Sequence, residues 1–366
     1  MKLIISRLEL VALIGKIQNV VPSKPAIPIL ANVLVEAIDD QLIISATDLT
    51  VSMRAYAECK VQEEGAITLP ARRFFQLIRE LTAPQVEIHT VSPEIATINA
   101  GSSHFKVHGM HKSEFPSFPD LSEAAQFSIS SVLLKEMLAR SAFAAARDDS
   151  RQVLNGILLQ SNAQVATFIG TDGKRLAKIH AKVELPADFS GSYIVPLKAI
   201  EEMIRMLDIK EEEPAKITLM SDKIALEIKS TTLISKLLSG QFPDVSRVIP
   251  TQKEQAISLH REELMSLLRQ VSLFTSDNNS SVRFSFTTGE LHLSATSGEI
   301  GEGKVNMPVN YAGEKLEIAF NPAYFLDILR HSKDETVNFN VTDSYNPGLI
   351  TDSSTAQFVL MPMRLE

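Results

Sequence analysis

The chain has 366 residues, a formal net charge of −8 and a sequence pI of about 5.6, and 45% of its residues are hydrophobic and 22% charged. This length exceeds one ordinary domain, and a composition so close to the globular average excludes disordered, collagen-like and coiled-coil chains. The single cysteine, Cys59, excludes a disulfide framework and any zinc site built from several cysteines. The acidic balance argues against an ordinary basic nucleic-acid-binding protein.

The first residues, MKLIISRLELVALIGKIQN, are as apolar as a signal peptide, but Arg7, Glu9 and Lys16 interrupt them and no small-residue cleavage site follows. Their pattern instead predicts a short strand followed by an amphipathic helix. No run of about 18 uncharged apolar residues occurs, so we expect no transmembrane helix. The lone cysteine fits a reducing, intracellular compartment.

This strand–helix unit recurs along the chain, at residues 3–14, 127–138 and 257–268, with offsets of 124 and 130. A second unit, a strand that ends at Pro or Asn before an amphipathic helix, begins at residues 68, 194 and 319, with offsets of 126 and 125. A weaker signal, Thr-Asp or Thr-Ser after an apolar strand, recurs at residues 47, 171 and 296. Strand–helix units are common in α+β proteins, but one shared period predicts three copies of one domain.

We therefore predict three domains, residues 1–124, 125–252 and 253–366, joined near residues 124 and 253. Each copy would contain two helices and many short strands of alternating polarity separated by turns. Such a pattern favours an α+β fold in which antiparallel sheets carry helices on one face.

Catalytic and cofactor motifs are absent: the sequence contains no GxxxxGK[ST], GxSxG or HExxH motif, and no GxGxxG follows a predicted strand. The glycines of residues 298–303 are predicted to form a loop between strands. His104, His108 and His111 have the spacing of possible ligands, but no carboxylate or cysteine completes the set, so we expect no metal and no cofactor. Cys59 is predicted to be a small buried hydrophobic residue rather than a nucleophile.

Seven segments of the chain carry specific motifs: KPAIPILAN (24–32), TDL (47–49), PARRFF (70–75), LNG (154–156), TDGKRL (171–176), FPD (242–244) and VLMPMRL (359–365). Together they resemble motifs of the bacterial sliding clamps, the beta subunits of DNA polymerase III, and this resemblance covers the whole chain. It implies three DNA-clamp domains that form half of a six-domain ring, a head-to-tail homodimer around double-stranded DNA. It also implies a non-catalytic, cytoplasmic processivity factor, nucleoid-associated during replication, without membrane contact. The implied partners are the polymerase III alpha subunit, the delta subunit of an ATP-driven clamp loader, and other clamp-motif repair and replication proteins.

Charge is sorted between the predicted helices and the rest of the chain. The six predicted helices together carry a net charge of +5, and because the whole chain carries −8, all other residues carry −13. The predicted helices are residues 7–19, 71–81, 131–147, 197–208, 261–274 and 322–333. Such a distribution suits weak, sequence-independent attraction to phosphates. The sequence departs from better-known clamps at Gln152 and Val153, where others carry two tyrosines. By resemblance, the DNA-facing residues are Lys24, Arg72, Arg147, Arg151, Lys198 and Arg205.

The resemblance further implies a pocket, between the second and third domains, for short peptide tails of partner proteins. Leu176 and the two C-terminal methionines would form an adaptable apolar hole, and Gly173 would let a peptide approach the backbone closely. Alternatively, Leu154 and Leu176 belong to the core. The pocket residues implied are Leu154, Thr171, Gly173, Lys174, Arg175, Leu176, Pro243, Arg247, Val248, Tyr324, Met361, Pro362, Met363 and Arg364.

A closed ring also needs a seam between the first domain of one copy and the third domain of the other. Phe105, Leu273 and Phe274 match apolar seam positions, and Arg73 is expected to pair across the seam with Glu299 or Glu302.

Two other functions remain open at this point. An enzyme of repeated α+β domains would need a polar pocket with paired titratable groups. A peptide-binding scaffold that never meets DNA would show no sorting of charge between helices and strands.

Overall fold

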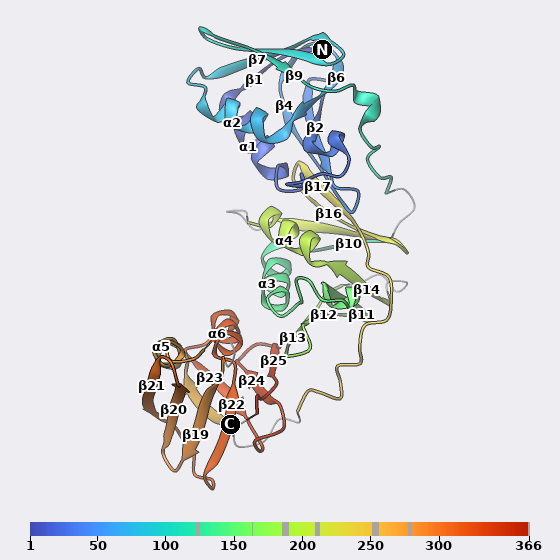
Figure 1. Ribbon diagram of the computed structural model, residues 1–366. Helices are drawn as coiled ribbons and strands as arrows, with labels where there is room; N and C mark the ends of the chain where they lie inside the picture. Colours follow the sequence, from blue (N-terminus) through green and yellow to red (C-terminus); the bar gives the residue numbers. More distant parts are fainter. Residues whose placement is uncertain are drawn as a thin grey trace. The chain divides into compact units, whose positions relative to one another are not determined.

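The computed structural model describes residues 1–121, 125–162, 164–184, 190–208, 213–250, 256–276 and 280–364. The chain divides into two compact units, which we describe one at a time (Figure 1). Unit 1 contains Met1–Lys135 and Lys198–Leu237, and unit 2 contains Glu136–Leu185, Ser190–Leu197 and Leu238–Glu366. The domain junctions predicted near residues 124 and 253 lie outside the described residues.

Unit 1 contains two antiparallel sheets, one of five strands in the order β5-β1-β7-β8-β9 and one of eight in the order β10-β15-β16-β17-β4-β3-β2-β6. Helices α1 and α2 lie side by side, and α1 packs on β4 and β3 (Figure 1). The apolar side chains of α1 at Leu10, Leu13, Ile14 and Ile17 are all buried, at the spacing of one helix face. The bounds are β1 Lys2–Ser6, α1 Arg7–Ile17, η1 Pro28–Ala31, β2 Asn32–Ile38, β3 Gln41–Thr47, β4 Val51–Glu58, β5 Lys60–Glu63, β6 Gly65–Pro70, α2 Ala71–Glu80, β7 Gln85–Ser92, β8 Ile95–Ala100, β9 Ser103–His108, η2 Lys112–Glu114, β10 Ala125–Ser130, β15 Pro214–Leu219, β16 Lys223–Ile228 and β17 Thr231–Lys236.

Unit 2 also contains two antiparallel sheets, one of eight strands in the order β14-β11-β12-β13-β25-β24-β23-β18 and one of four in the order β21-β20-β19-β22. Helices α5 and α6 lie side by side, and α5 packs on β20 and β21 (Figure 1). The bounds are η3 Gln152–Leu154, β11 Gly156–Asn162, β12 Val165–Thr171, β13 Arg175–Lys182, β14 Gly191–Pro196, β18 Ile257–His260, α5 Arg261–Ser272, β19 Val282–Thr287, β20 Glu290–Ser297, β21 Gly301–Pro308, β22 Leu316–Phe320, α6 Pro322–His331, β23 Thr336–Asn340, β24 Gly348–Thr351 and β25 Gln357–Leu360. Two helices begin in one unit and end in the other, α3 Ser131–Ala142 and α4 Leu197–Met206.

The central repeat contributes strands to both eight-stranded sheets. Strand β17 pairs with β4 in unit 1, and β13 pairs with β25 in unit 2. We call these two pairings the β4–β17 joint and the β13–β25 joint. Because each joint is continuous backbone hydrogen bonding, consecutive repeats share a sheet rather than only touching.

The predicted α+β class and the two helices per repeat are confirmed, and all six predicted helices occur within a few residues of their expected bounds. The third helix ends at Ala142, so the expected extension to residue 147 is wrong. With the observed bounds the six helices carry a net charge of +4, which leaves −12 of the total −8 elsewhere. The sorting of charge therefore survives the correction.

The expected loop at residues 298–303 is also corrected, because Gly301 and Gly303 belong to strand β21. A Cβ atom at Gly303 would lie 2.5 Å from Cδ2 of Phe274. The glycine is therefore explained by an aromatic ring that lies directly on the strand, and not by a turn.

Candidate partner-binding and DNA-binding sites

The turn at residues 171–175 contains Thr171, Gly173, Lys174 and Arg175 of the predicted peptide pocket. Thr171 Oγ1 donates to the carbonyl oxygen of Arg175 at 2.7 Å and accepts from the Gly173 amide at 3.1 Å. Asp172 Oδ1 accepts from the amides of Lys174 and Arg175, both at 2.9 Å. These bonds hold Gly173 at φ +82°, a left-handed conformation that costs a residue with a Cβ about 1–2 kcal/mol.

Arg175 connects this turn to helix α6. Its guanidinium donates to Asp172 at 3.2 Å and to Asp327 at 2.7 Å, and it lies over the Tyr324 ring at 4.5 Å from the centroid. The start of α6 is fixed by Asn321, whose Oδ1 accepts from the Ala323 and Tyr324 amides at 2.9 and 3.3 Å. Tyr324 and Arg175 thus meet because an N-cap and a turn each hold their backbone.

The C-terminal segment lies against the same turn. The Met361 amide donates to the Lys174 carbonyl at 2.9 Å, and the Met363 amide donates to the Ala319 carbonyl at 2.8 Å. Met361 is 39% exposed, Pro362 and Met363 are half-buried and Arg364 is exposed. The segment is therefore held by its backbone, while its side chains remain accessible in part.

The floor of this region is an apolar cluster of unit 2. Leu176 faces Val359 across the β13–β25 joint, and both belong to a cluster with Leu158, Ile169, Ile194 and Leu349. Residues 240–250, which we call the strap, cross this floor and pack Phe242, Val245 and Ile249 on it.

Two of the predicted pocket residues are core residues by exposure, Leu154 at 1% and Leu176 at 3%. Val248 is 41% exposed, and Pro243 and Arg247 are exposed on the strap. The structure thus brings the turn, α6, the C-terminal segment and the strap together within unit 2. The leucines lie beneath them.

The predicted DNA-facing residues of unit 1 differ in their surroundings. Lys24 and Arg72 are exposed. Lys198 donates to the Val20 carbonyl at 3.0 Å and forms an ion pair with Asp48. Arg205 is paired with the buried Glu202 on its own helix.

The other two predicted DNA-facing residues lie in unit 2, after the end of α3. Arg147 is exposed. Arg151 donates to Asp149 at 2.9 and 3.0 Å, and the Arg151 hydrogen bonds hold the pKa of the Asp149 carboxyl at about 2. Its guanidinium also lies beside Gly173, only 3.2 Å from where a Cβ would stand. Arg151, which the resemblance placed in the DNA-facing set, therefore also borders the candidate peptide pocket.

The predicted seam residues lie on two edges. Phe105 is 38% exposed on β9, at the end of its sheet, and Leu273 is 72% exposed just after α5. Phe274 lies on Gly303 of β21, again at the end of a sheet. Arg73 and Glu299 are exposed, and Glu302 is paired with Lys304.

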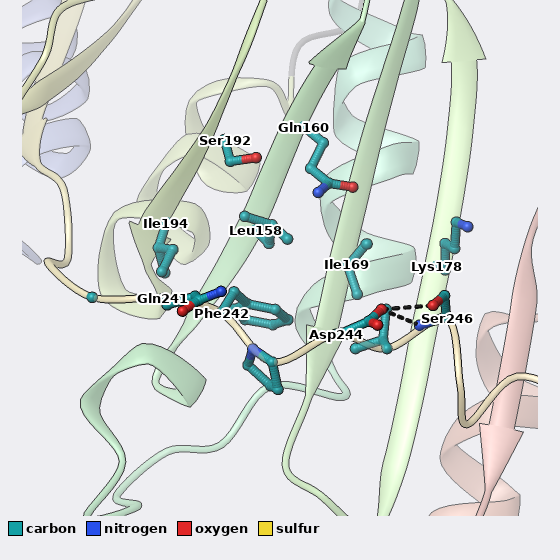
Figure 2. Close-up of a pocket in the computed structure, with 13 residues that line it drawn as sticks. Leu158, Gln160, Ile169, Lys178, Ser192, Ile194, Gln241, Phe242, Asp244 and Ser246 are labelled. Carbon is teal, nitrogen blue, oxygen red and sulfur yellow. Dashed lines mark hydrogen bonds between the residues drawn. The ribbon is translucent and has the colours of Figure 1, made fainter.

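A cavity of about 510 Å³ that the sequence did not predict lies beside the strap (Figure 2). Its lining comes from the four strands β11–β14 and from residues 240–246 of the strap. The repeat contains a sequence signal for this region: Lys178 and Phe242 lie 124 positions after Arg54 and Phe118, so they are the equivalents of those residues in the central repeat.

No catalytic constellation emerges in the part of the chain that the structure describes. Burial and the neighbouring Asp40 raise the pKa of the Cys59 thiol to about 11, so this thiol is protonated at neutral pH. Among the described residues, no group of three or more His, Cys, Asp or Glu side chains has the geometry to hold a metal ion. Within the same residues, no helix is long and apolar enough to cross a membrane.

Comparison with known proteins gives matches along the whole chain. Residues 1–119, 128–244 and 246–364 match the N-terminal, central and C-terminal domain models of the DNA polymerase III beta subunit. The chain is 54% identical to the beta sliding clamp of Chlamydia muridarum over 100% of its length and 99% of the relative's, and 30% identical to that of Escherichia coli over 100% of both.

Solved structures agree with the sequence matches. A sliding clamp of Pseudomonas aeruginosa bound to griselimycin superposes with a TM-score of 0.94 at 30% identity, and that of Bacillus subtilis with 0.95 at 26%, each over 100% of both chains. A griselimycin-bound clamp of Bartonella birtlesii gives 0.95 at 28% identity, also over 100% of both chains.

Proposed function

The chain belongs to the DNA polymerase III beta-subunit family, the sliding clamps, which are non-catalytic processivity factors of DNA replication. From that premise we propose that two copies close head to tail into a six-domain ring that encircles duplex DNA in the cytoplasm, at the nucleoid. The ring slides without sequence specificity and tethers the replicative polymerase through a peptide pocket in unit 2.

The proposed ring is supported mainly by two strand edges, β9 and β21, that have no partner strand among the described residues. Strands β4, β13 and β21 begin at residues 51, 175 and 301, so they are equivalent in the three repeats, as are β9, β17 and β25, which begin at residues 103, 231 and 357. Strand β4 pairs with β17, and β13 pairs with β25. The third pairing of this series, β21 with β9, is missing: each is the end strand of its sheet among the described residues.

An open edge offers unpaired N–H and C=O groups to another chain. If β21 of one copy pairs with β9 of a second copy, and the reverse pairing also forms, two chains close a ring in which every member of this series of strand pairings is present. Exposed apolar side chains lie at these edges, with Phe105 on β9 and Leu273 and Ile300 near β21. Arg73 is proposed to meet Glu299 or Glu302 across the same seam.

Light scattering tests the seam. The wild-type chain is expected to have about twice its mass of 40.3 kDa, and L273A/F274A to have the mass of one chain because the apolar seam contact is lost. L8A is the matched control, since Leu8 is 69% exposed on α1 and belongs to neither edge strand. A double variant that keeps the mass of two chains would remove Leu273 and Phe274 from the seam.

The charge distribution supports a loose contact with DNA. The helices are net positive and the remainder is net negative, which favours phosphate at the helices alone. Lys198 and Arg205 are already paired with carboxylates, so phosphates must compete for them. Lys24 and Arg72 are exposed, and together with Arg147 and Arg151 they complete the proposed DNA-facing set. Such weak and exchangeable contacts suit sliding.

The peptide pocket is supported by the arrangement around Gly173. A residue without a Cβ stands where backbone must approach backbone, and two methionines that adapt to different anchors lie beside it. We propose that this pocket takes tails of the polymerase alpha subunit, the loader delta subunit and other clamp-motif proteins. The strap residues Pro243, Arg247 and Val248 would form its outer rim.

Clamps of Pseudomonas aeruginosa and Bartonella birtlesii have been solved bound to griselimycin, and we propose this compound as the probe of the pocket. Calorimetric titration should show binding to the wild type and a loss of tenfold or more in M361A/M363A. Y345A serves as control, since Tyr345 is 87% exposed in unit 2 outside the pocket residues. Equal affinity in all three proteins would contradict the assignment.

A further inference from the structure

The cavity beside the strap continues the candidate peptide pocket along the same sheet face. Its floor is one row of paired residues across four strands, in which Ile194, Leu158, Ile169 and Lys178 face one another in turn. Leu176 precedes Lys178 by two positions on β13, so both point to the same face. Figure 2 shows the Phe242 ring beside Leu158, with Lys178 at the far end of the row.

The first repeat covers the equivalent row with its own side chains. There the row is Thr68, Leu34, Ser45 and Arg54. Arg54 donates to Ser45 at 3.3 Å and lies over the ring of Phe118 at 4.1 Å.

In the central repeat Ile169 replaces the serine and Lys178 replaces the arginine. A cavity of about 510 Å³ lies where the cation and the ring met in the first repeat. The row is thus more apolar and opens on space that another chain can fill.

The same face of β13 is basic. Lys178, His180 and Lys182 alternate along the strand after Leu176, and within the described residues no ion pair includes any of the three. Their neighbours across the sheet, Gln357, Thr167 and Val165, carry no charge. Lys178 and Lys182 thus have no ion-pair partner among the described residues, although Glu184 follows Lys182 by two positions, and in a chain of net charge −8 these two lysines favour an acidic partner.

The nearest carboxylate in the cavity lining is already satisfied. Asp244 accepts from the Ser246 amide at 3.0 Å and from its hydroxyl at 2.6 Å, and pairs with Arg247 at 3.4 Å. These contacts lower the pKa of Asp244, with the Ser246 hydrogen bonds as the main cause. Asp244 is therefore held by contacts within the strap, and no ion pair joins it to Lys178 among the described residues.

We propose that the cavity and the basic stripe of β13 form an extension of the peptide pocket that selects partner tails with an acidic flank. An apolar side chain of the flank enters the cavity against Leu158, Ile169 and Phe242, and carboxylates next to it meet Lys178 and Lys182. This inference rests on the proposed peptide pocket. It adds a charge-dependent specificity that the anchor residues alone do not supply.

The test is a titration of the full-length protein with three labelled peptides at low ionic strength. The first contains only Leu and Phe anchors among uncharged residues, the second adds a flank of Leu with Asp and Glu, and the third adds an uncharged flank of equal length. Each flank is placed in turn before and after the anchors. We expect the acidic flank, on one side of the anchors, to tighten binding about three- to tenfold, and less at high salt.

Charge reversal then locates the effect. K178E/K182E should abolish the gain from the acidic flank and leave the affinity for the anchor peptide and for griselimycin unchanged. K60E/K112E is the matched control, because both lysines are exposed in unit 1. An acidic flank without any gain, or a gain that persists in K178E/K182E, would overturn the extension. If the anchor peptide itself fails to bind, the peptide pocket is wrong and the extension falls with it.

Discussion

Two turns in the molecule have the same hydrogen bonds and different surroundings. At residues 47–51, Thr47 Oγ1 donates to the Val51 carbonyl at 3.1 Å and accepts from the Leu49 amide at 3.0 Å, and Asp48 Oδ1 accepts from the amides of Thr50 and Val51. Residues 171–175 repeat this pattern bond for bond. Each turn also accepts a backbone hydrogen bond from the end of the strand paired at its joint. The Lys236 amide donates to the Thr50 carbonyl, and the Met361 amide donates to the Lys174 carbonyl, both at 2.9 Å.

The two turns differ in the residue at their third position. Leu49 has φ +74° in the first repeat and Gly173 has φ +82° in the central repeat. The backbone conformation is the same, but only the leucine has a side chain in front of the turn. We therefore expect this one side chain to decide whether the shared turn can take a peptide.

The joints also differ in how they hold charge. Arg140 on α3 is 5% exposed, and it pairs with the fully buried carboxylate of Asp352 and with Glu136, while its Nε donates to the His331 carbonyl at 2.7 Å. The equivalent residue on α1, 124 positions earlier, is Lys16. Burial and the neighbouring Lys229 lower the pKa of Lys16, so this cation meets a like charge where Arg140 meets carboxylates.

The strongest loss of stability is expected when the buried ion pairs of Arg140 are removed. R140A leaves the Asp352 carboxylate buried without its guanidinium and should lower the free energy of unfolding of unit 2 by about 3–5 kcal/mol. K16A removes no ion pair and should change stability by less than about 1 kcal/mol. Urea unfolding of both variants checks the contrast, and equal losses would show that the two joints are held alike.

The next effect converts one turn into the other. G173L gives the central turn the side chain of the first and should weaken griselimycin binding at least tenfold, since Leu blocks the approach and pushes on Arg151. G289L is the control because Gly289 has φ +81° and open space around it, so the backbone strain is matched. If G289L weakens binding as much as G173L, strain rather than access explains the loss.

A smaller effect concerns pH at the β13–β25 joint. Burial is the main cause that lowers the pKa of His331, which stacks on Phe143 at 4.2 Å. Below about pH 6.5 the unfolded chain binds a proton that the folded chain does not, so stability falls as pH decreases, by less than about 1.4 kcal/mol per pH unit.

The β4–β17 joint suggests the substitution that tests this pH dependence, because Met206 there is the equivalent of His331, 125 positions earlier in the sequence. H331M should flatten the dependence of the melting temperature on pH between about 7 and 5.5. An unchanged slope would mean that His331 is not the group that titrates.

The smallest effect tests the ion pair at the β4–β17 joint. The Lys198 side chain is 40% exposed, so its pair with Asp48 should contribute less than about 1 kcal/mol and fade at high salt. A double-mutant cycle with K198A and D48A measures the coupling directly. A coupling above about 2 kcal/mol would make this pair as important as the buried one around Arg140.

The repeats made much of this fold predictable. Period and polarity located all six helices, because a strand–helix switch survives in each copy. Tertiary packing was not predictable: the Phe274 ring packs on Gly303 of strand β21, and Arg151, which is paired with Asp149, lies beside Gly173. The Arg140–Asp352 pair joins residues 212 positions apart, and nothing local in the sequence marks it.

In the proposed ring, topology rather than affinity keeps the chain on DNA. The direct measurement is retention of labelled protein on nicked circular DNA after loading by the ATP-driven clamp loader, followed by linearisation with a restriction enzyme. We predict that the protein stays on the circle at salt concentrations that abolish phosphate contacts and leaves within minutes once the DNA has ends. Retention that does not change on linearisation would contradict an encircling, sliding ring.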